Sequence, residues 1–171
     1  MSLYVETVPR FTQMLTNIDS WLTEASEYAA SRGFDPESFL SMRLYPDQFP
    51  LRRQIQSSCD TAKLGVSRLT GVDAPVHEDG EQSIEELRAR ITEVKAYMAA
   101  VPQSAFEGRG QEVISPGFLR GGAITTENLV RQFSVPNFYF HATTAYSILR
   151  HNGVKLGKMA FIGGLDVIKP S

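Results

Sequence analysis

Apolar side chains recur along most of the chain with the three-and-four spacing of one face of an α-helix. The first such segment covers residues 2–31, and Gly33 follows it as a residue that readily ends a helix in the left-handed conformation. Asp35 and Pro36 then supply an N-cap and a proline for a first turn. The pattern therefore predicts a long amphipathic helix and then a short helix over residues 36–40.

Two further stripes with the same spacing predict the second and third long helices, over residues 50–71 and 83–101. The third helix opens with Ser83 and Glu86, which have the spacing of a capping box. The connection over residues 72–82 is polar and irregular. It contains the densest charge cluster of the chain, His-Glu-Asp-Gly-Glu, which we expect to be a solvated loop that includes His77.

Residues 103–124 break the helical pattern with several glycines and prolines. Within this region, residues 112–114 and 118–120 flank a Ser-Pro-Gly sequence, so a small β-hairpin is predicted there.

The fourth long helix is predicted over residues 126–152, with Gly153 as its C-cap. Pro136 falls inside this helix, where it predicts either a kink or a restart because proline removes one backbone hydrogen bond. Four long amphipathic helices predict an all-α fold, a four-helix bundle formed by residues 1–171 as a single domain.

Composition and charge exclude some classes of protein. The 171 residues are 42% hydrophobic and carry a formal net charge of −2, which does not indicate a nucleic-acid-binding surface. Cys59 is the only cysteine, so no intrachain disulfide can form, in agreement with a reducing compartment. Glu6 and Arg10 interrupt any leader-like apolar run, and no apolar stretch approaches the roughly 20 residues that cross a bilayer. We expect a cytoplasmic protein with neither nucleic-acid nor membrane partners.

His141 is the residue most suggestive of chemistry. It shares one row of the fourth helix with Asn137 and Ile148, so its ring should point into the bundle or its mouth. One interpretation is a buried histidine that is hydrogen-bonded to a neighbouring polar group. The other is a metal ligand or a general base.

The second helix offers polar partners for such a histidine. Gln56 and Asp60 lie on the flank of its apolar stripe. Asp60 could accept a proton from His141, pair with an arginine or lysine, or lie on the surface. Cys59 lies on the stripe itself and is expected to act as a small apolar residue rather than as a nucleophile. Tyr139 is interpreted as a packing or hydrogen-bonding residue.

The run PNFYFHATTAYSILRHNGVKLGK, residues 136–158, resembles a bacterial branch of the DinB/YfiT-like superfamily that is described only as a domain of unknown function. Phe49-Pro50, Gln54 and Asp60 also resemble its pattern, and the resemblance covers essentially the whole chain. It implies a DinB-like, up-down-down-up bundle with a long crossover between the third and fourth helices, and it implies a homodimer. The superfamily contains candidate metalloenzymes related to thiol-dependent transferases and isomerases.

The metal site of that superfamily uses one histidine from the second helix and two, four residues apart, from the fourth. His141 matches the second of that pair, but Asn137 stands at the position of the first, and residues 49–71 contain no histidine. Zn²⁺ and Ni²⁺ prefer nitrogen and sulfur ligands. We therefore expect no bound metal or other cofactor, although a divalent Ni or Zn ion would have His141 and Asp60 as its ligands. A hydrogen-bonded cluster of His141, Asn137 and Asp60, with Tyr139 or Gln54, should replace the metal.

Two functional hypotheses remain at this stage. The favoured one is a non-catalytic protein with a degenerate site, which binds a small ligand or a partner in a pocket that includes Asn137, Gln56, Gln54 and Tyr139. The alternative is a metal-dependent, or metal-free general-base, transferase or hydrolase of small molecules. In that enzyme His141 would act at the bundle mouth and Asp60 would orient it.

Overall fold

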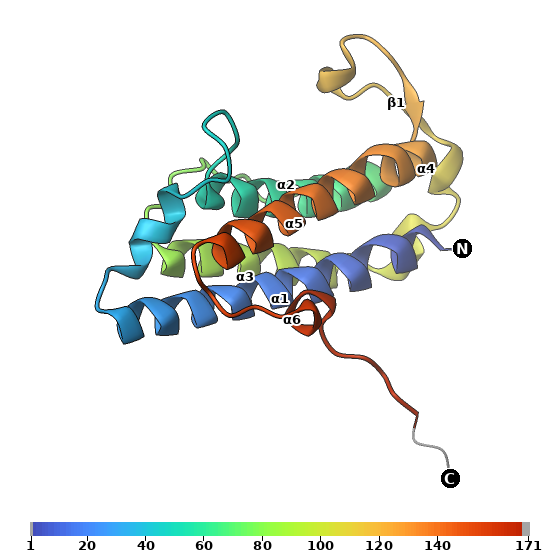
Figure 1. Cartoon of the computed structure of the whole chain (residues 1–171). Coiled ribbons are helices and arrows are strands. Elements are labelled where there is room, and N and C mark those ends of the chain that lie inside the picture. Colours follow the sequence, from blue (N-terminus) through green and yellow to red (C-terminus); the bar gives the residue numbers. More distant parts are fainter. Residues whose placement is uncertain (1, 169–171) are drawn as a thin grey trace.

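Four long helices lie side by side in a bundle in the computed structural model, which describes residues 2–168 (Figure 1). These helices are α1 (Leu3–Arg32), α2 (Leu51–Thr70), α3 (Ile84–Ala100) and α5 (Val135–His151). Helices α1 and α2 each pack against both α3 and α5. The all-α bundle predicted from the sequence is therefore confirmed.

Local sequence signals account for the ends of these helices. Gly33 and Gly71 both adopt the left-handed conformation immediately after α1 and α2. The capping box before α3 is present, because the backbone N–H of Glu86 donates to Ser83 Oγ and the backbone N–H of Ser83 donates to the Glu86 carboxylate. The predicted short helix is a 3₁₀ helix, η1 (Pro36–Ser41).

The fourth predicted helix contains an irregular turn where Pro136 was expected to disturb it. It comprises α4 (Thr126–Leu129), a π-helical turn, η5 (Val130–Ser134), and then α5. Pro136 lies in the first turn of α5, where a missing N–H is tolerated. The wider π turn directly before it marks the restart of the helix.

The connection between α3 and α4 contains short elements, and one of them corrects the sequence prediction. Strand β1 (Val113–Ile114) pairs with β2 (Ile124–Thr125) in an antiparallel ladder, so a hairpin is present. The second strand expected over residues 118–120 is wrong, because η4 (Gly117–Leu119) turns there and Arg120 continues the turn with a φ of 48°. The same connection contains η2 (Gln103–Phe106) and η3 (Arg109–Gln111).

The chain directions follow the up-down-down-up order. In Figure 1, α2 and α3 run the same way, while α1 and α5 run the opposite way. The long connection expected between α3 and the fourth helix is present and stays at one end of the bundle. Helix α2 has 20 residues and is therefore about 30 Å long. Because α2 and α3 run the same way, the connection between them must return along this length.

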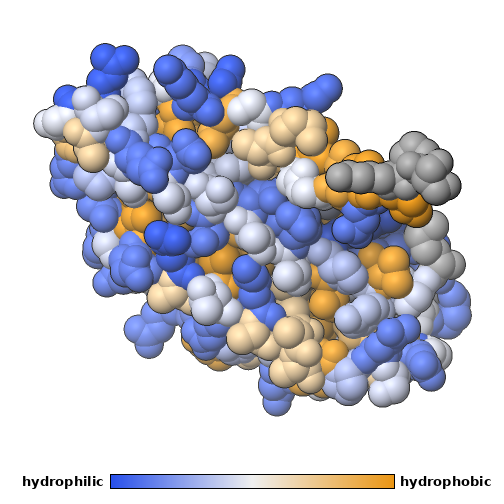
Figure 2. Space-filling view, turned by 90° about the horizontal axis from the view of Figure 1, so that it is seen from below, coloured by the Kyte–Doolittle hydropathy of each residue, from blue (hydrophilic) through white to orange (hydrophobic). Residues whose placement is uncertain are grey.

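The chain after α5 folds back onto α1 through a short helix, α6 (Lys158–Ile162), which the sequence pattern did not predict. Trp21 Nε1 donates to the carbonyl of Ala160 over 2.9 Å, and the Phe161 ring stacks on Trp21 with centroids 5.8 Å apart. Asn17 Nδ2 donates to the carbonyl of Phe161 over 2.8 Å. Figure 2 views this side of the molecule, where apolar residues lie among hydrophilic ones.

Within residues 2–168, no helix has both the length and the apolar character needed to span a membrane.

We expect Gly153→Ala to destabilise the fold. Gly153 has a φ of 98°, and a Cβ there would lie 2.9 Å from Cζ of Tyr28. The strained backbone should cost about 1–3 kcal/mol of unfolding free energy, before any clash is counted. Chemical denaturation measures the effect, and Gly157→Ala is the matched control, because its Cβ would meet no atom within 4 Å. Equal stability of the two variants would contradict the expectation.

Candidate functional site

A row of polar side chains lies between α2 and α5. We call Gln54, Thr61, Asn137 and His141 the polar row, because hydrogen bonds join them in pairs across the two helices.

The hydrogen bonds of Gln54 fix the tautomer of His141. Gln54 Nε2 donates to the carbonyl of Phe49 over 3.0 Å, so Gln54 Oε1 is the atom that faces the imidazole. His141 Nδ1 lies 2.8 Å from this oxygen. Because the oxygen can only accept, Nδ1 carries the proton. In the neutral ring, Nε2 is then an acceptor.

Aromatic side chains flank His141 at the surface. The Phe49 ring is nearly parallel to the imidazole, with an interplanar angle of 11° and centroids 6.4 Å apart, and Phe140 approaches edge-on at 5.2 Å. Phe49 and Phe140 are 49% and 57% exposed, whereas His141 is half-buried. We call Phe49, Phe140 and His141 the His141 surface.

The charge state of His141 follows from its surroundings. Burial lowers the pKa of the ring below its usual range, and the positive charge of Arg53 lowers the pKa further. Arg53 itself lies over the Phe49 ring, 5.7 Å from its centroid. The imidazole is therefore neutral near pH 7, with its Nε2 lone pair available.

Asn137 occupies the second half of the polar row. Its Nδ2 donates to Thr61 Oγ1 over 2.8 Å, and Thr61 Oγ1 donates to the carbonyl of Ser57 over 2.7 Å. The polar cluster expected around His141 therefore contains Asn137 and Gln54, and it also contains Thr61, which sequence reasoning had missed. Thr61 is recognisable afterwards because it lies two helical turns beyond Gln54 on α2.

Asp60 and Gln56 lie on a different side of α2, facing α3. Asp60 Oδ1 accepts from Arg90 Nη2 over 2.6 Å and from Lys63 Nζ over 3.1 Å. Of the alternatives open for Asp60, pairing with arginine and lysine is therefore the one observed, and its carboxylate does not orient His141. Gln56 Nε2 donates to Glu81 over 2.7 Å, so this residue does not join the polar row either.

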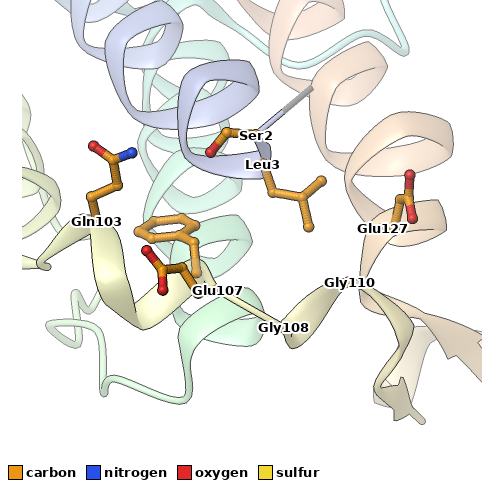
Figure 3. Close-up of a pocket in the computed structure, with 8 residues that line it drawn as sticks. Ser2, Leu3, Gln103, Glu107, Gly108, Gly110 and Glu127 are labelled. Carbon is orange, nitrogen blue, oxygen red and sulfur yellow. The ribbon is translucent and has the colours of Figure 1, made fainter.

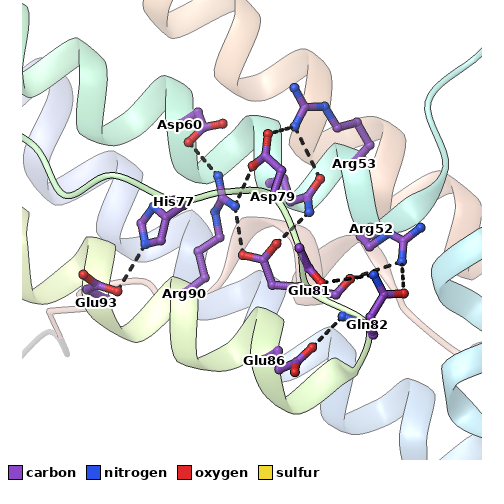
Figure 4. A network of polar contacts seen from close by, with 12 residues as sticks. Arg52, Arg53, Asp60, His77, Asp79, Glu81, Gln82, Glu86, Arg90 and Glu93 are labelled. Atoms are coloured by element: carbon purple, nitrogen blue, oxygen red, sulfur yellow. Dashed lines mark hydrogen bonds and ion pairs between the residues drawn. The ribbon is translucent and has the colours of Figure 1, made fainter.

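Arg90 is the centre of an ionic network between α2, α3 and the connection that joins them (Figure 4). Its side chain is 1% exposed, and its Nη1 atom lies 2.7 Å from Asp79 and 2.8 Å from Glu81. Burial alone would lower the pKa of Arg90, but the hydrogen bonds that it donates to Glu81 and Asp79 outweigh burial and raise the pKa. The same bonds hold the pKa values of both carboxyl groups below their usual range, despite the opposing effect of burial.

The prediction of a solvated loop holds for Glu78, which is exposed, but it is wrong for His77 and Glu81, whose side chains contact the bundle. His77 Nδ1 accepts from Lys63 Nζ over 2.5 Å, and its Nε2 lies 3.2 Å from Glu93. The His77 side chain is only 10% exposed. The missed signal was Arg90, a charged residue three positions after Leu87 on the apolar face of α3, which requires carboxylate partners.

Tyr139 faces α1 rather than the polar row. It lines a pocket of about 240 Å³ together with Arg10, Met14 and Ile162. Burial raises the pKa of its phenol. The six residues proposed from the sequence as one site are therefore divided among three faces of the bundle.

Cys59 is fully buried, and burial raises the pKa of its thiol to about 12. A thiol with such a pKa is protonated at neutral pH and is a poor nucleophile. This environment matches the interpretation of Cys59 as a small apolar residue.

A cavity of about 460 Å³ lies at the end of the bundle, away from His141 (Figure 3). Leu3 and Phe106 supply apolar lining, and Glu107 and Glu127 lie on opposite sides of Leu3 in Figure 3. Glu127 is already bound to Arg131 and to Gln111. Among the described residues, the lining of this cavity includes no histidine or cysteine.

Comparison with known proteins assigns the chain to a family. The model of a domain of unknown function, DUF1993, matches residues 3–162. The chain belongs to the DUF1993 family. A crystal structure of a DinB family member protein from Shewanella denitrificans is similar to this DUF1993 chain, with 40% sequence identity and a TM-score of 0.95. The match covers 98% of this chain and 96% of that one. No curated protein matches.

The polar row of this DUF1993 member does not fit the metal of the DinB/YfiT-like superfamily. It offers one imidazole, two neutral amides and a hydroxyl, and the amides already bond within the row or to backbone. Such a set is poor in the nitrogen and sulfur donors that Zn²⁺ and Ni²⁺ prefer. Across residues 2–168, no three histidine, cysteine, aspartate or glutamate side chains are grouped as metal ligands. Absence of a metal in the isolated protein stays a prediction.

Elemental analysis of protein purified without a metal-affinity tag should find no stoichiometric Zn or Ni. Stoichiometric metal in the wild type that is lost in His141→Ala would contradict this prediction.

We also expect Asn137→His to increase the affinity for Ni²⁺, measured by calorimetry, because residues four apart on α5 share one face. His141→Ala in the same background is the control and should remove the gain.

The His141 ring should titrate below its unfolded pKa of about 6.5. Arg53→Gln should raise this midpoint, because it removes a repulsive positive charge. Since the unfolded chain binds the proton more readily, the contribution of His141 to stability is lost as the pH falls through its unfolded pKa toward the lower folded value. NMR of the imidazole measures both midpoints. A wild-type midpoint above 6.5 would refute the electrostatic explanation. So would an Arg53→Gln variant whose His141 ring titrates at the same midpoint as the wild type.

Proposed function

We propose that this DUF1993 member is a non-catalytic binding protein that takes a small ligand on the His141 surface. The ligand would place an apolar face against Phe49 and Phe140 and donate a hydrogen bond to His141 Nε2. The proposal rests chiefly on one observation, the hydrogen bond between His141 Nδ1 and Gln54 Oε1, because it leaves Nε2 as an acceptor at the surface.

The neutral partner of His141 argues for binding rather than catalysis. Histidine bases in enzymes are commonly oriented by a carboxylate, which stabilises the imidazolium formed during proton transfer. Gln54 cannot supply that charge, and Asp60 is committed to Arg90 and Lys63. The arrangement therefore supports recognition of a hydrogen-bond donor in preference to removal of its proton.

The alternative, a metal-free general-base enzyme, is supported by the same unprotonated Nε2. An imidazole held neutral near pH 7 is in the correct state to accept a proton. The metal-dependent version of this alternative has less support, since the donor set is neutral and oxygen-rich.

The proposal includes a cytoplasmic location and a homodimer. The single cysteine supports a reducing compartment.

Exposed apolar side chains such as Met159, Ile162 and Leu165 offer surface that a second copy would cover. Sedimentation equilibrium distinguishes a dimer from a monomer directly.

Phe140→Ala should weaken the binding of ligands found by screening a metabolite library with ligand-observed NMR. The loss should be about tenfold or more, since a half-exposed aromatic ring contributes on the order of 1.4 kcal/mol when a ligand covers it. Phe118→Ala is the matched control, because Phe118 is 43% exposed and stacks on Phe133 instead.

Two results would overturn the proposal. Ligands that bind equally well to wild type and to Phe140→Ala would place recognition elsewhere. Conversion of a bound ligand by the wild type, lost in His141→Gln, would establish the general-base alternative in its place.

A further inference from the structure

The connection between α2 and α3 is held to the bundle by side chains. We call residues 72–82 the strap. Among the described residues, no backbone–backbone hydrogen bond outside the helices and strands reaches the strap, and its Val76 side chain is 91% exposed. Its attachment therefore depends on side chains, both those of the strap and those of Arg52 and Tyr97, which donate to strap carbonyls.

The face of the bundle beneath the strap carries an excess of positive charge. Arg53 and Lys63 of α2 and Arg90 of α3 all contact the strap, and we call these three residues together with Gln56 the arginine cleft. Asp60 is the carboxylate of α2 that offsets part of this charge. The Lys63 and Arg90 side chains are 5% and 1% exposed, so neither is left to water.

Two carboxylates of the strap fill this cleft in the manner of a bound peptide (Figure 4). Asp79 binds Arg53 and Arg90, and Glu81 binds Arg90 and Gln56. The two acidic residues are separated by Gly80, and they converge on one guanidinium. Arg90 Nε is buried without a hydrogen-bond partner among the described residues, so the strap does not satisfy every donor of the cleft.

We propose that the arginine cleft is a recognition site for an acidic peptide segment of a partner protein, and that the strap occupies it as an intramolecular ligand. The recognised chemistry is a pair of carboxylates spaced as in Asp-Gly-Glu. Charge-assisted hydrogen bonds to buried arginine provide both affinity and geometry. This inference does not rest on the proposed function, but Arg53 links the two sites, because it also lies over Phe49 of the His141 surface.

Competition with the strap sets the conditions for such a partner. A tethered ligand has an effective concentration in the millimolar range for short flexible linkers, so an isolated acidic peptide competes poorly with it. A partner must therefore present several contacts, one of which is the paired carboxylates. The strap would then act as an autoinhibitory segment that excludes weaker anions.

The test uses the double variant Asp79→Asn with Glu81→Gln, which removes both charges and nearly preserves side-chain size. The heteronuclear ¹H–¹⁵N NOE of residues 72–82 should fall, while amide exchange in α2 and α5 stays slow. A synthetic peptide of residues 75–82, PVHEDGEQ with blocked ends, should then bind the double variant and not the wild type, as measured by calorimetry. The same peptide with Asn and Gln in place of its Asp79 and Glu81 equivalents should bind at least about tenfold more weakly.

The controls separate this proposal from a purely structural role. Arg53→Gln in the double-variant background should weaken the peptide, because Arg53 is one of its carboxylate partners. Arg43→Gln, which alters an arginine that bonds only within residues 43–48, should leave the affinity unchanged.

Several outcomes would overturn the proposal. A strap whose heteronuclear NOE stays high in the double variant would show that its carboxylates do not hold it. Failure of the peptide to bind a released variant, or equal binding of the neutral peptide, would show that the cleft is no receptor. Equal binding of inorganic phosphate at matched ionic strength would replace peptide recognition with general anion binding. If the double variant does not fold, the single variant Glu81→Gln replaces it: the peptide should bind this variant more tightly than the wild type, and no gain would refute the inference.

Discussion

The buried guanidinium of Arg90 determines how the second half of the bundle is connected. Helices α2 and α3 run in the same direction, so the chain between them must return along the bundle rather than close in a tight turn. That returning segment makes no backbone ladder, and the carboxylates of Asp79 and Glu81 attach it to Arg90. The dependence is mutual, because a buried arginine that loses its partners is strongly destabilising. The ionic network and the up-down-down-up chain path therefore require one another.

Helix α2 separates two polar regions of different character. Toward α5 it presents Gln54 and Thr61, which make neutral hydrogen bonds with His141 and Asn137. Toward α3 it presents charged groups, among them Asp60 and Lys63. Neutral hydrogen bonds are little affected by salt, whereas partly exposed ion pairs are screened by it. The two sides of one helix can thus respond to different conditions.

Most of the fold could be predicted from local sequence, whereas the composition of the site could not. Helices α1, α2 and α3, the glycines after α1 and α2 and the capping box depend on neighbouring residues and were predicted correctly. The prediction that Asp60 contacts His141 is wrong. Gln54 faces His141, and at 3.6 residues per turn Asp60 lies roughly 120° around α2 from Gln54. The residues of α2 alone do not reveal which of these directions faces α5. Thr61, about 20° from Gln54 by the same rotation, is the residue that faces Asn137.

The strap illustrates a different limit of sequence reasoning. An acidic run with a glycine reads as a solvated loop when only its neighbours are considered. Arg90 changes that interpretation, since a charged residue on an apolar helical face must find carboxylates, and the densest acidic run in the chain lies in the strap. The partners of Arg90 are 9, 11 and 30 residues away, beyond any helical spacing. No sequence motif marks a long-range ion pair of this kind. It is inferred because a buried arginine requires carboxylate partners.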